Sequence, residues 1–388
     1  MACVLAILTA ACSSGAGPEH VVRVDYQHDE FASHYWRYFP STVYAHPGDT
    51  VVFKQEWTGE PHTVTFGARL DELAEQVAAL DSRLGDSPTP EQEEEAGREY
   101  ESLSEGIVFD PYIDADAPLA AKPCYLRSGR PPRDRDESCP VREQPSFDGG
   151  YSYYSSGFIP PSGPSGNTYR VPLADTIRSG TYNFHCVIHY GYMQGRLVVK
   201  PSGESIPSAG EMDRQALEEI ASAASPLRKA LTEVRAGRGQ TDGKPVSGPI
   251  AGYHSGGEFT VALDEFVPKR ITARVGEPVT WTVIGAHTIS FDVPRFVPVY
   301  TVADNGTVER NPVVDRAAGG SPDPPPADFS SGPSVIDGGT WDGSGFFSSG
   351  LLASEPYTKY TVRVSDPGEH FFACLVHPAM VGTLVVRD

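Results

Sequence analysis

Residues 180–195 read GTYNFHCVIHYGYMQG and residues 368–382 read GEHFFACLVHPAMVG, so one pattern occurs twice in the chain. In each copy a Gly precedes a Cys by six positions, a His follows the Cys by three, and a Gly comes two positions after a Met. Each copy then continues into a Val-rich run, RLVV or TLVV, that is typical of a β-strand. The two stretches predict a duplicated unit in which a short loop joins two strands.

The match between the copies continues upstream. Pro40 and Gly48 are eight positions apart, as are Pro268 and Gly276, and each pair leads into a strand-like run, DTVVF or EPVTW. A histidine then opens a further strand, His62 in the first copy and His287 in the second. Agreement at so many spacings indicates duplicated domains. We expect a signal and tether over 1–19, domains over 20–201 and 253–388, and a linker over 202–252.

Composition limits the possible classes of protein. The 388 residues carry a formal charge of −20, and 39% are hydrophobic, which is enough for packed cores. The negative charge argues against nucleic-acid binding, because contacts with phosphates supply most of that affinity. No apolar run reaches the roughly 18 residues of a membrane-spanning helix. The sequence therefore predicts an acidic, mostly β protein.

Two segments interrupt the β pattern. Apolar residues at three-to-four spacing predict a helix over 211–235 of the linker, which Pro226 should kink or split. Apolar positions from Leu70 to Leu84 predict a second amphipathic helix, inserted in the first domain. Residues 68–110 hold 13 acidic and 3 basic side chains. This stretch is either a solvated acidic surface or a docking face for a cationic partner.

The duplicated residues suggest a chemistry. Two imidazoles, one thiolate and a weak thioether are the ligands of a blue, type 1 copper site, with trigonal His₂Cys coordination and a distant axial Met. Zinc sites normally use Cys pairs, or His with carboxylates, and not Met. Only four Met occur in the chain, and two of them fall at this axial position. We expect one copper per domain, bound by His62, Cys186, His189 and Met193 and by His287, Cys374, His377 and Met380.

On these motifs both repeats resemble cupredoxin domains of the plastocyanin and azurin type, and the second loop is similar to that of amicyanin. The resemblance implies two Greek-key β-sandwiches, each with copper at one end. It covers about half of the chain and leaves out the long insertions and the partly helical linker. The first domain has three residues between His189 and Met193, where amicyanin has two and plastocyanin four. Thr63 and Thr288 follow the first His of each set, where many relatives have Asn.

Other histidines do not complete a second type of copper centre. His185 is next to Cys186, as in multicopper oxidases and copper nitrite reductases, but the chain has no His-x-His pair. We expect His185 to be an ordinary polar strand residue and His370 to serve in packing. His20, His28, His34, His46 and His254 show no ligand spacing.

The cysteine pattern and the N-terminus suggest export. Cys124 and Cys139 flank a short polar loop and form either a disulfide or two free thiols; oxidising compartments permit the former. The apolar start of the chain, ending in Ala-Ala-Cys12, resembles a bacterial lipoprotein signal with Cys12 as the acylated residue. An ordinary secretory signal is the alternative. We therefore expect an exported protein, either a lipoprotein on the outer face of the cell membrane or a secreted or periplasmic one.

The leading functional hypothesis is a non-enzymatic one-electron carrier that meets a redox protein partner, with His189 and His377 as the exits for the electron. Such encounters have small, transient interfaces. The runner-up is extracytoplasmic copper sequestration or delivery, for which exchangeable Met-rich or His-rich tracts are expected but absent from the sequence. Copper oxidase or nitrite reductase activity is disfavoured by the missing second-centre histidines.

Overall fold

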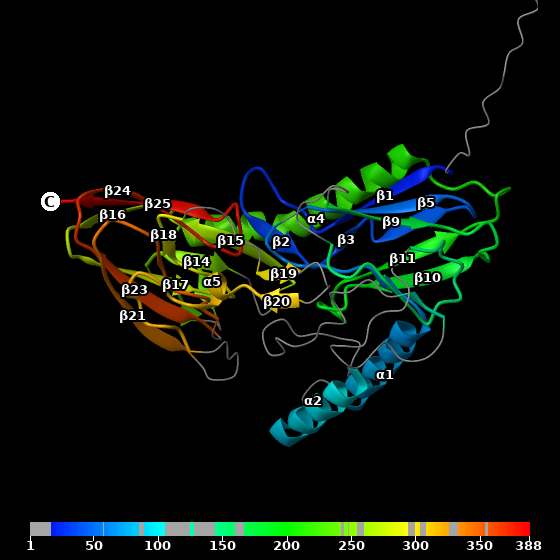
Figure 1. Cartoon of the computed structure of the whole chain (residues 1–388), viewed down its shortest axis with the longest axis horizontal. Helices are drawn as coiled ribbons and strands as arrows, with labels where there is room; N and C mark the ends of the chain where they lie inside the picture. The colour runs from blue at the N-terminus through cyan, green and yellow to red at the C-terminus, as the bar shows by residue number, and fades with distance from the viewer. Residues whose placement is uncertain are drawn as a thin grey trace, which may run out of the picture.

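The computed structural model shows two β-sandwiches that are bridged by a long helix (Figure 1). The structure describes residues 17–56, 58–84, 89–104, 125–127, 144–159, 167–241, 244–246, 248–253, 260–293, 299–302, 308–325, 333–353 and 356–388.

The first sandwich packs a four-stranded sheet on a six-stranded sheet. The four-stranded sheet has the order β3 (Tyr38–Phe39), β1 (Glu19–Val24), β5 (Thr50–Gln55), β9 (Thr168–Pro172). The other has the order β4 (Thr42–Ala45), β11 (Gln194–Val199), β10 (Gly180–His185), β6 (Thr65–Phe66), β8 (Tyr153–Ser155), β7 (Tyr125–Leu126). Buried and accessible residues alternate along β1, β9 and β11, because successive side chains point to opposite faces of a strand.

The second sandwich repeats this plan. One sheet has the order β2 (Ser33–Tyr35), β15 (Val261–Val267), β14 (Ile250–Tyr253), β17 (Pro278–Val283), β23 (Thr358–Val364), β21 (Ser334–Trp341). The other has the order β16 (Arg270–Arg274), β25 (Val381–Arg387), β24 (Gly368–Ala373), β18 (Ser290–Phe291), β22 (Phe347–Ser348).

The two sandwiches share details of pairing. The parallel pairs β1–β5 and β11–β4 of the first have the counterparts β14–β17 and β16–β25 in the second. A cis peptide bond precedes Pro40 and likewise Pro268, just before β4 and β16. Strands that are distant in sequence pair in each sheet, as the Greek-key prediction requires. The predicted fold class, two β-sandwiches in a mostly β chain, is confirmed.

Aromatic residues fill both cores. Phe53, Phe66 and Phe184 contact one another inside the first sandwich, with ring centroids 5.0–6.1 Å apart. Trp281, Phe291 and Phe372 form the matching cluster in the second, at 5.4–6.3 Å. All six are almost completely buried, and such pairs add about 0.5–1.5 kcal/mol each beyond the burial of their surface. These rigid cores hold the loops at the ends of the strands in place.

One strand crosses from the first half of the chain to the second sandwich. β2 pairs antiparallel with β15, with Tyr35 opposite Val261 and Ser33 opposite Leu263. β2 is the edge strand of that sheet and lies between β1 and β3 in the sequence, although both of these belong to the first sandwich. The two halves are therefore joined by a sheet as well as by the linker.

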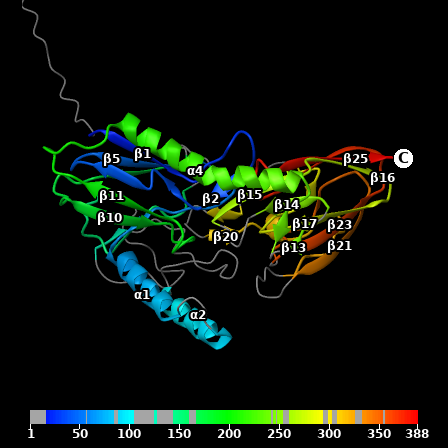
Figure 2. The same cartoon turned by 180° about the vertical axis from the view of Figure 1, so that it is seen from behind.

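Helix α4 (Ala209–Arg235) spans both sandwiches (Figure 2). A capping box of Ser208 and Glu211 fixes its start. Of the predicted kink or split at Pro226, the split does not occur: the helix continues through this residue and changes direction near its middle in Figure 2. Its buried face, which includes Ala216, Ile220 and Leu227, packs against residues of both halves and compensates for the missing hydrogen bond of the proline. The linker is thus a packed element.

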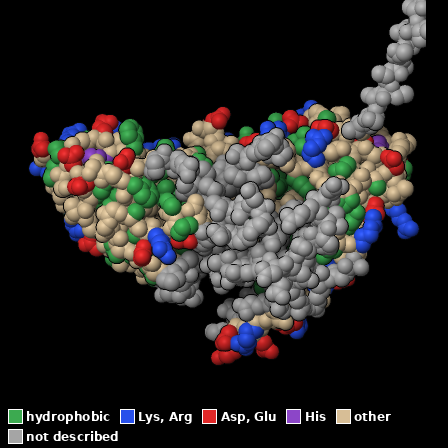
Figure 3. Space-filling view, in the orientation of Figure 1, with side chains coloured by type: hydrophobic (Ala, Val, Ile, Leu, Met, Phe, Trp, Pro, Cys, Tyr) green, Lys and Arg blue, Asp and Glu red, His purple; other side chains and the backbone are tan. Residues whose placement is uncertain are grey.

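The insertion in the first domain forms a helical hairpin of α1 (Ala68–Leu84) and α2 (Pro90–Ser104). Leu70, Leu73 and Leu80 are buried, as the sequence predicts, and the Arg83–Glu99 ion pair at 2.6 Å joins the two helices. Figure 3 shows acidic side chains at the lower tip of this hairpin. Its acidic residues thus project from the molecule on a separate element.

Five short elements complete the described structure. Strand β12 (Gln240–Thr241) pairs with β13 (Lys244–Pro245), β19 (Tyr300–Val302) pairs with β20 (Val308–Arg310), and α5 (Pro312–Asp315) is a short helix. Among the described residues, no helix carries an apolar stretch long enough to span a bilayer.

Candidate metal centres

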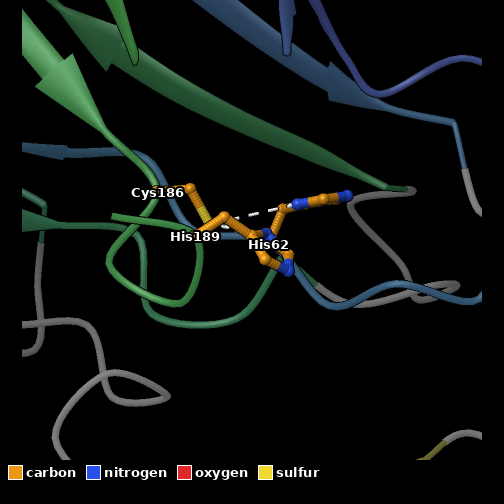
Figure 4. A group of neighbouring side chains, drawn as sticks. All are labelled: His62, Cys186 and His189. Carbon is orange, nitrogen blue, oxygen red and sulfur yellow. Dashed lines mark hydrogen bonds between the residues drawn. The ribbon is translucent and has the colours of Figure 1, made fainter. Parts of the chain in front are cut away.

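The first cluster lies at the end of the first sandwich (Figure 4). Cys186 directly follows β10, His189 lies in the loop to β11, and His62 comes from the segment before β6. The sulfur of Cys186 is 3.9 Å from Nδ1 of His62 and 3.5 Å from Nδ1 of His189. All three residues are buried, and their ligand atoms converge on one point.

The second cluster repeats the first. Cys374 directly follows β24, and its sulfur is 3.9 Å from Nδ1 of His287 and 3.6 Å from Nδ1 of His377. The two Nδ1 atoms are 3.0 Å apart. The structure therefore brings both predicted His–Cys–His sets together, although His62 and Cys186 are 124 positions apart in the sequence.

Backbone hydrogen bonds place each Met beside its cluster. The N–H of Cys186 donates to the carbonyl of Met193, and the N–H of Cys374 to that of Met380, both at 3.0 Å. Each Met N–H also donates to the carbonyl of the preceding ligand, His189 or His377. Both Met side chains are completely buried. The longer first loop closes with the same bonds as the shorter second loop, because Gly191 adopts a positive φ of 88°.

The residue after the first His of each set links the loops around the sulfur. The backbone N–H groups of Thr63 and Thr288 donate to the sulfurs of Cys186 and Cys374, both at 3.4 Å. Their hydroxyls accept from the N–H groups of Val187 and Leu375. Thr therefore fixes the two ligand segments to each other with its side chain and contacts the sulfur with its backbone.

The donor sets fit a bound metal ion. Bonds of about 2.3 Å to sulfur and 2.0 Å to nitrogen at trigonal angles separate each nitrogen from the sulfur by about 3.7 Å. The four distances in the chain, 3.5, 3.6, 3.9 and 3.9 Å, scatter around this value. A soft thiolate with two imidazoles and a neighbouring thioether matches copper better than zinc.

The histidines favour the thiolate form of both cysteines. Burial alone would raise the pKa of the Cys186 thiol, but His189 and His62 outweigh it and hold the pKa well below its ordinary value. At Cys374, burial would again raise the pKa of the thiol, but His287 and His377 outweigh it and hold the pKa well below the ordinary value. The thiolate is the form that binds a metal ion.

Carboxylates contact the outer nitrogens of three of the four histidines. Nε2 of His62 lies 3.1 Å from Asp25, which also accepts from the hydroxyl of Thr58. Nε2 of His377 lies 3.3 Å from Oε1 of Glu60, and Nε2 of His189 lies 3.7 Å from Oε2 of the same residue. A carboxylate at Nε2 fixes the ring so that Nδ1 is available to the metal.

Glu60 is ionised between the two sandwiches. Burial alone would raise the pKa of its carboxyl, but His189 and His377 hold the pKa well below the ordinary value. His34, Glu60 and His377 also lie close enough to hold a metal ion. Because Nδ1 of His377 already faces Cys374, we interpret its contact with Glu60 as the orientation of a ligand.

Sequence reasoning missed Asp25, Glu60, Asp264, His34 and Trp36. His34 shows no ligand spacing in the sequence, but its Nδ1 lies 3.1 Å from Asp264 and its ring stacks on that of His377, with centroids 6.0 Å apart. One signal was available: Glu60 precedes His62 by two positions, whereas Gly285 precedes His287. This difference in an otherwise close repeat marks a residue with a role in one copy only.

The two histidines that were predicted as exits for the electron do not lie at the surface of the molecule. His189 and His377 are only 4% and 2% exposed, because the ends of the two sandwiches cover each other. His185 lies outside both clusters, as expected, but it is buried and contacts the Tyr190 ring. His370 packs on Trp341, as expected. Cys12, Cys124 and Cys139 lie outside the described residues.

No protein-family model matches the chain, and no curated protein matches its sequence. Solved structures similar to it include the purple cupredoxin of Nitrosopumilus maritimus, at 17% identity and a TM-score of 0.18, which matches 37% of this chain and 100% of that one. Reduced auracyanin of Roseiflexus castenholzii is 16% identical over 48% of this chain and 100% of that one, with a TM-score of 0.24. A mutant fern plastocyanin is 25% identical over 32% of this chain and 89% of that one, with a TM-score of 0.16. Each of these matches covers less than half of this chain.

Proposed function

We propose that the chain binds two type 1 copper ions, one per sandwich, and transfers single electrons without catalysing a reaction of its own. The observation that carries this proposal is the duplicated convergence of two Nδ1 atoms and one thiolate beside a buried Met. Such a site changes oxidation state without forming or breaking bonds to a substrate. The protein supplies ligands that stay in place in both oxidation states.

Burial of the ligands supports electron transfer over copper delivery. Every His and Cys of the two clusters is buried, and backbone bonds hold the loops. A carrier that hands copper to a partner needs ligands that the partner can reach and replace one at a time. Sequestration in these closed sites is the second candidate, and it predicts copper without a redox partner.

The test is metal analysis of the purified full chain after copper loading. We expect two coppers per chain, an intense visible band from the thiolate–copper bond and the narrow hyperfine splitting of type 1 copper in electron paramagnetic resonance. One copper, or two zinc ions without colour, would contradict the proposal.

We further propose that the chain is exported and held at the outer face of the cell membrane through lipid on Cys12. The Ala-Ala-Cys12 context supports this proposal. Loss of the protein from the membrane fraction in Cys12→Ala is the expected result. Unchanged fractionation and processing would contradict it.

For a redox protein partner, we propose a cationic surface that meets the α1–α2 hairpin. The exposed Glu91 and Glu95 of α2 are among its acidic side chains. Association through exposed charges weakens as salt rises, so the rate of electron exchange with a cationic partner should fall at high ionic strength.

A further inference from the structure

The two clusters face each other across one carboxylate. Glu60 is 4% exposed and sits between His189 of the first sandwich and His377 of the second. Its two oxygens lie 3.7 Å and 3.3 Å from the Nε2 atoms of these rings. The Glu60 carboxylate therefore lies between Nε2 of His189 in the first set and Nε2 of His377 in the second.

A stack of rings forms a second connection between the same two histidines. His189 stacks on Trp36 with centroids 4.2 Å apart and planes 15° apart. Trp36 stacks on His34 at 5.7 Å and 18°, and His34 on His377 at 6.0 Å and 19°. Four nearly parallel rings thus run from one cluster to the other.

The segment that carries the middle rings is fixed in the second sandwich. His34 belongs to β2, where it pairs with Ala262, and its Nδ1 lies 3.1 Å from the buried Asp264. The N–H of Trp36 donates to the carbonyl of Thr260 at 2.9 Å. These bonds fix the backbone of both residues and the imidazole of His34 between the two clusters.

We propose that the two copper sites exchange an electron within one chain, through Glu60 and the Trp36–His34 stack between His189 and His377. This inference rests on the proposed function, because it needs copper in both sites. One electron moves: the donating site is oxidised from Cu(I) to Cu(II), the accepting site is reduced from Cu(II) to Cu(I), and no bond is broken. Tunnelling weakens steeply across empty space, so a continuous path of contacts favours this exchange over direct exchange between molecules.

The experiment uses the full chain with copper in both sites. A pulse of reductant supplies less than one electron per chain, and the two visible bands are followed as the electron redistributes. We expect a first-order phase whose rate constant does not change with protein concentration. An observed rate constant that rises in proportion to protein concentration would overturn the inference. So would the absence of any redistribution of the electron between two sites of different potential.

Three variants test the path. Glu60→Gln and Trp36→Leu should each slow the first-order phase, and the double variant should slow it further. Phe371→Leu is the matched control, because the Phe371 ring is 73% exposed on β24 and takes no part in the stack, so its loss should leave the rate constant unchanged. An unchanged rate in the double variant with both coppers bound would exclude this path.

A measurement on the unaltered chain keeps the inference testable if a variant does not fold. With both sites oxidised, electron paramagnetic resonance should show dipolar coupling between the two Cu(II) ions, and Cys374→Ser should remove it. Absence of coupling would contradict the facing arrangement. Failure to form two type 1 sites would instead contradict the proposed function, and the inference would fall with it.

Discussion

The two metal clusters have the same ligands but different surroundings. In the first, Asp25 contacts the outer nitrogen of His62, and three residues separate His189 from Met193. In the second, the backbone of Gly252 lies against the outer nitrogen of His287, and only Pro378 and Ala379 precede Met380. Each sandwich thus supplies its own set of candidate ligands. The residues that contact these ligands from behind differ, and such residues tune the metal affinity and the potential of a site.

The largest difference between the two sites should appear when one of the two cysteines is removed. Cys186→Ser should abolish only the first site and Cys374→Ser only the second, because each domain has a complete ligand set. Copper content should fall by one in each variant, and the visible band should fall to the share of the remaining site. If either substitution removes all colour, the two sites are not assembled independently.

The next effect concerns the second site alone. A Cβ on Gly252 would lie 2.0 Å from Nε2 of His287 and 2.4 Å from the carbonyl oxygen of Ile284, so Gly252→Ala should displace this ring and the adjoining backbone and lose copper from the second site. Gly248→Ala is the control, because Gly248 also has a positive φ but its Cβ would approach only Thr280, at 3.6 Å. Equal copper loss in both variants would assign the effect to backbone strain.

A smaller effect is expected at the first site from the carboxylate behind His62. Asp25→Asn should lower the affinity of the first site for copper by about 10–100-fold and leave the second unchanged, because the partner that orients a ligating His contributes this much. Competition with a copper chelator, followed at each visible band, measures both affinities. Equal weakening of both sites would show that Asp25 acts on the fold as a whole.

The smallest effect should come from the axial positions. The loops to Met193 and Met380 differ in length, so a redox titration should show two midpoints. Met193→Leu should move only the first midpoint and Met380→Leu only the second, with copper retained. Met212→Leu, at a buried Met of α4 that belongs to neither ligand loop, is the control and should move neither midpoint. A single midpoint for both sites would remove the argument from loop length.

The sequence allowed the two sandwiches and the two converging His–Cys–His sets to be predicted, because residues on one loop have fixed spacing and strands have a repeating pattern. The residues between the clusters could not be found in this way. Glu60 and His377 are 317 positions apart, and they meet only because the sandwiches pack end to end. For α4 the sequence left a kink or a split at Pro226 open, and only the packing of the helix against both halves decides that it continues through the proline.

The placement of β2 has a consequence for the history of the chain. Tandem duplication usually produces two units that can later be separated, recombined or lost. Here residues 33–35 of the first copy cover the edge of β15 in the second. Excision of the first copy would expose a row of unpaired backbone groups along that edge, which is a template for aggregation. The first half of the chain therefore protects this edge of the second sandwich, and separation of the halves should lower the solubility of the second.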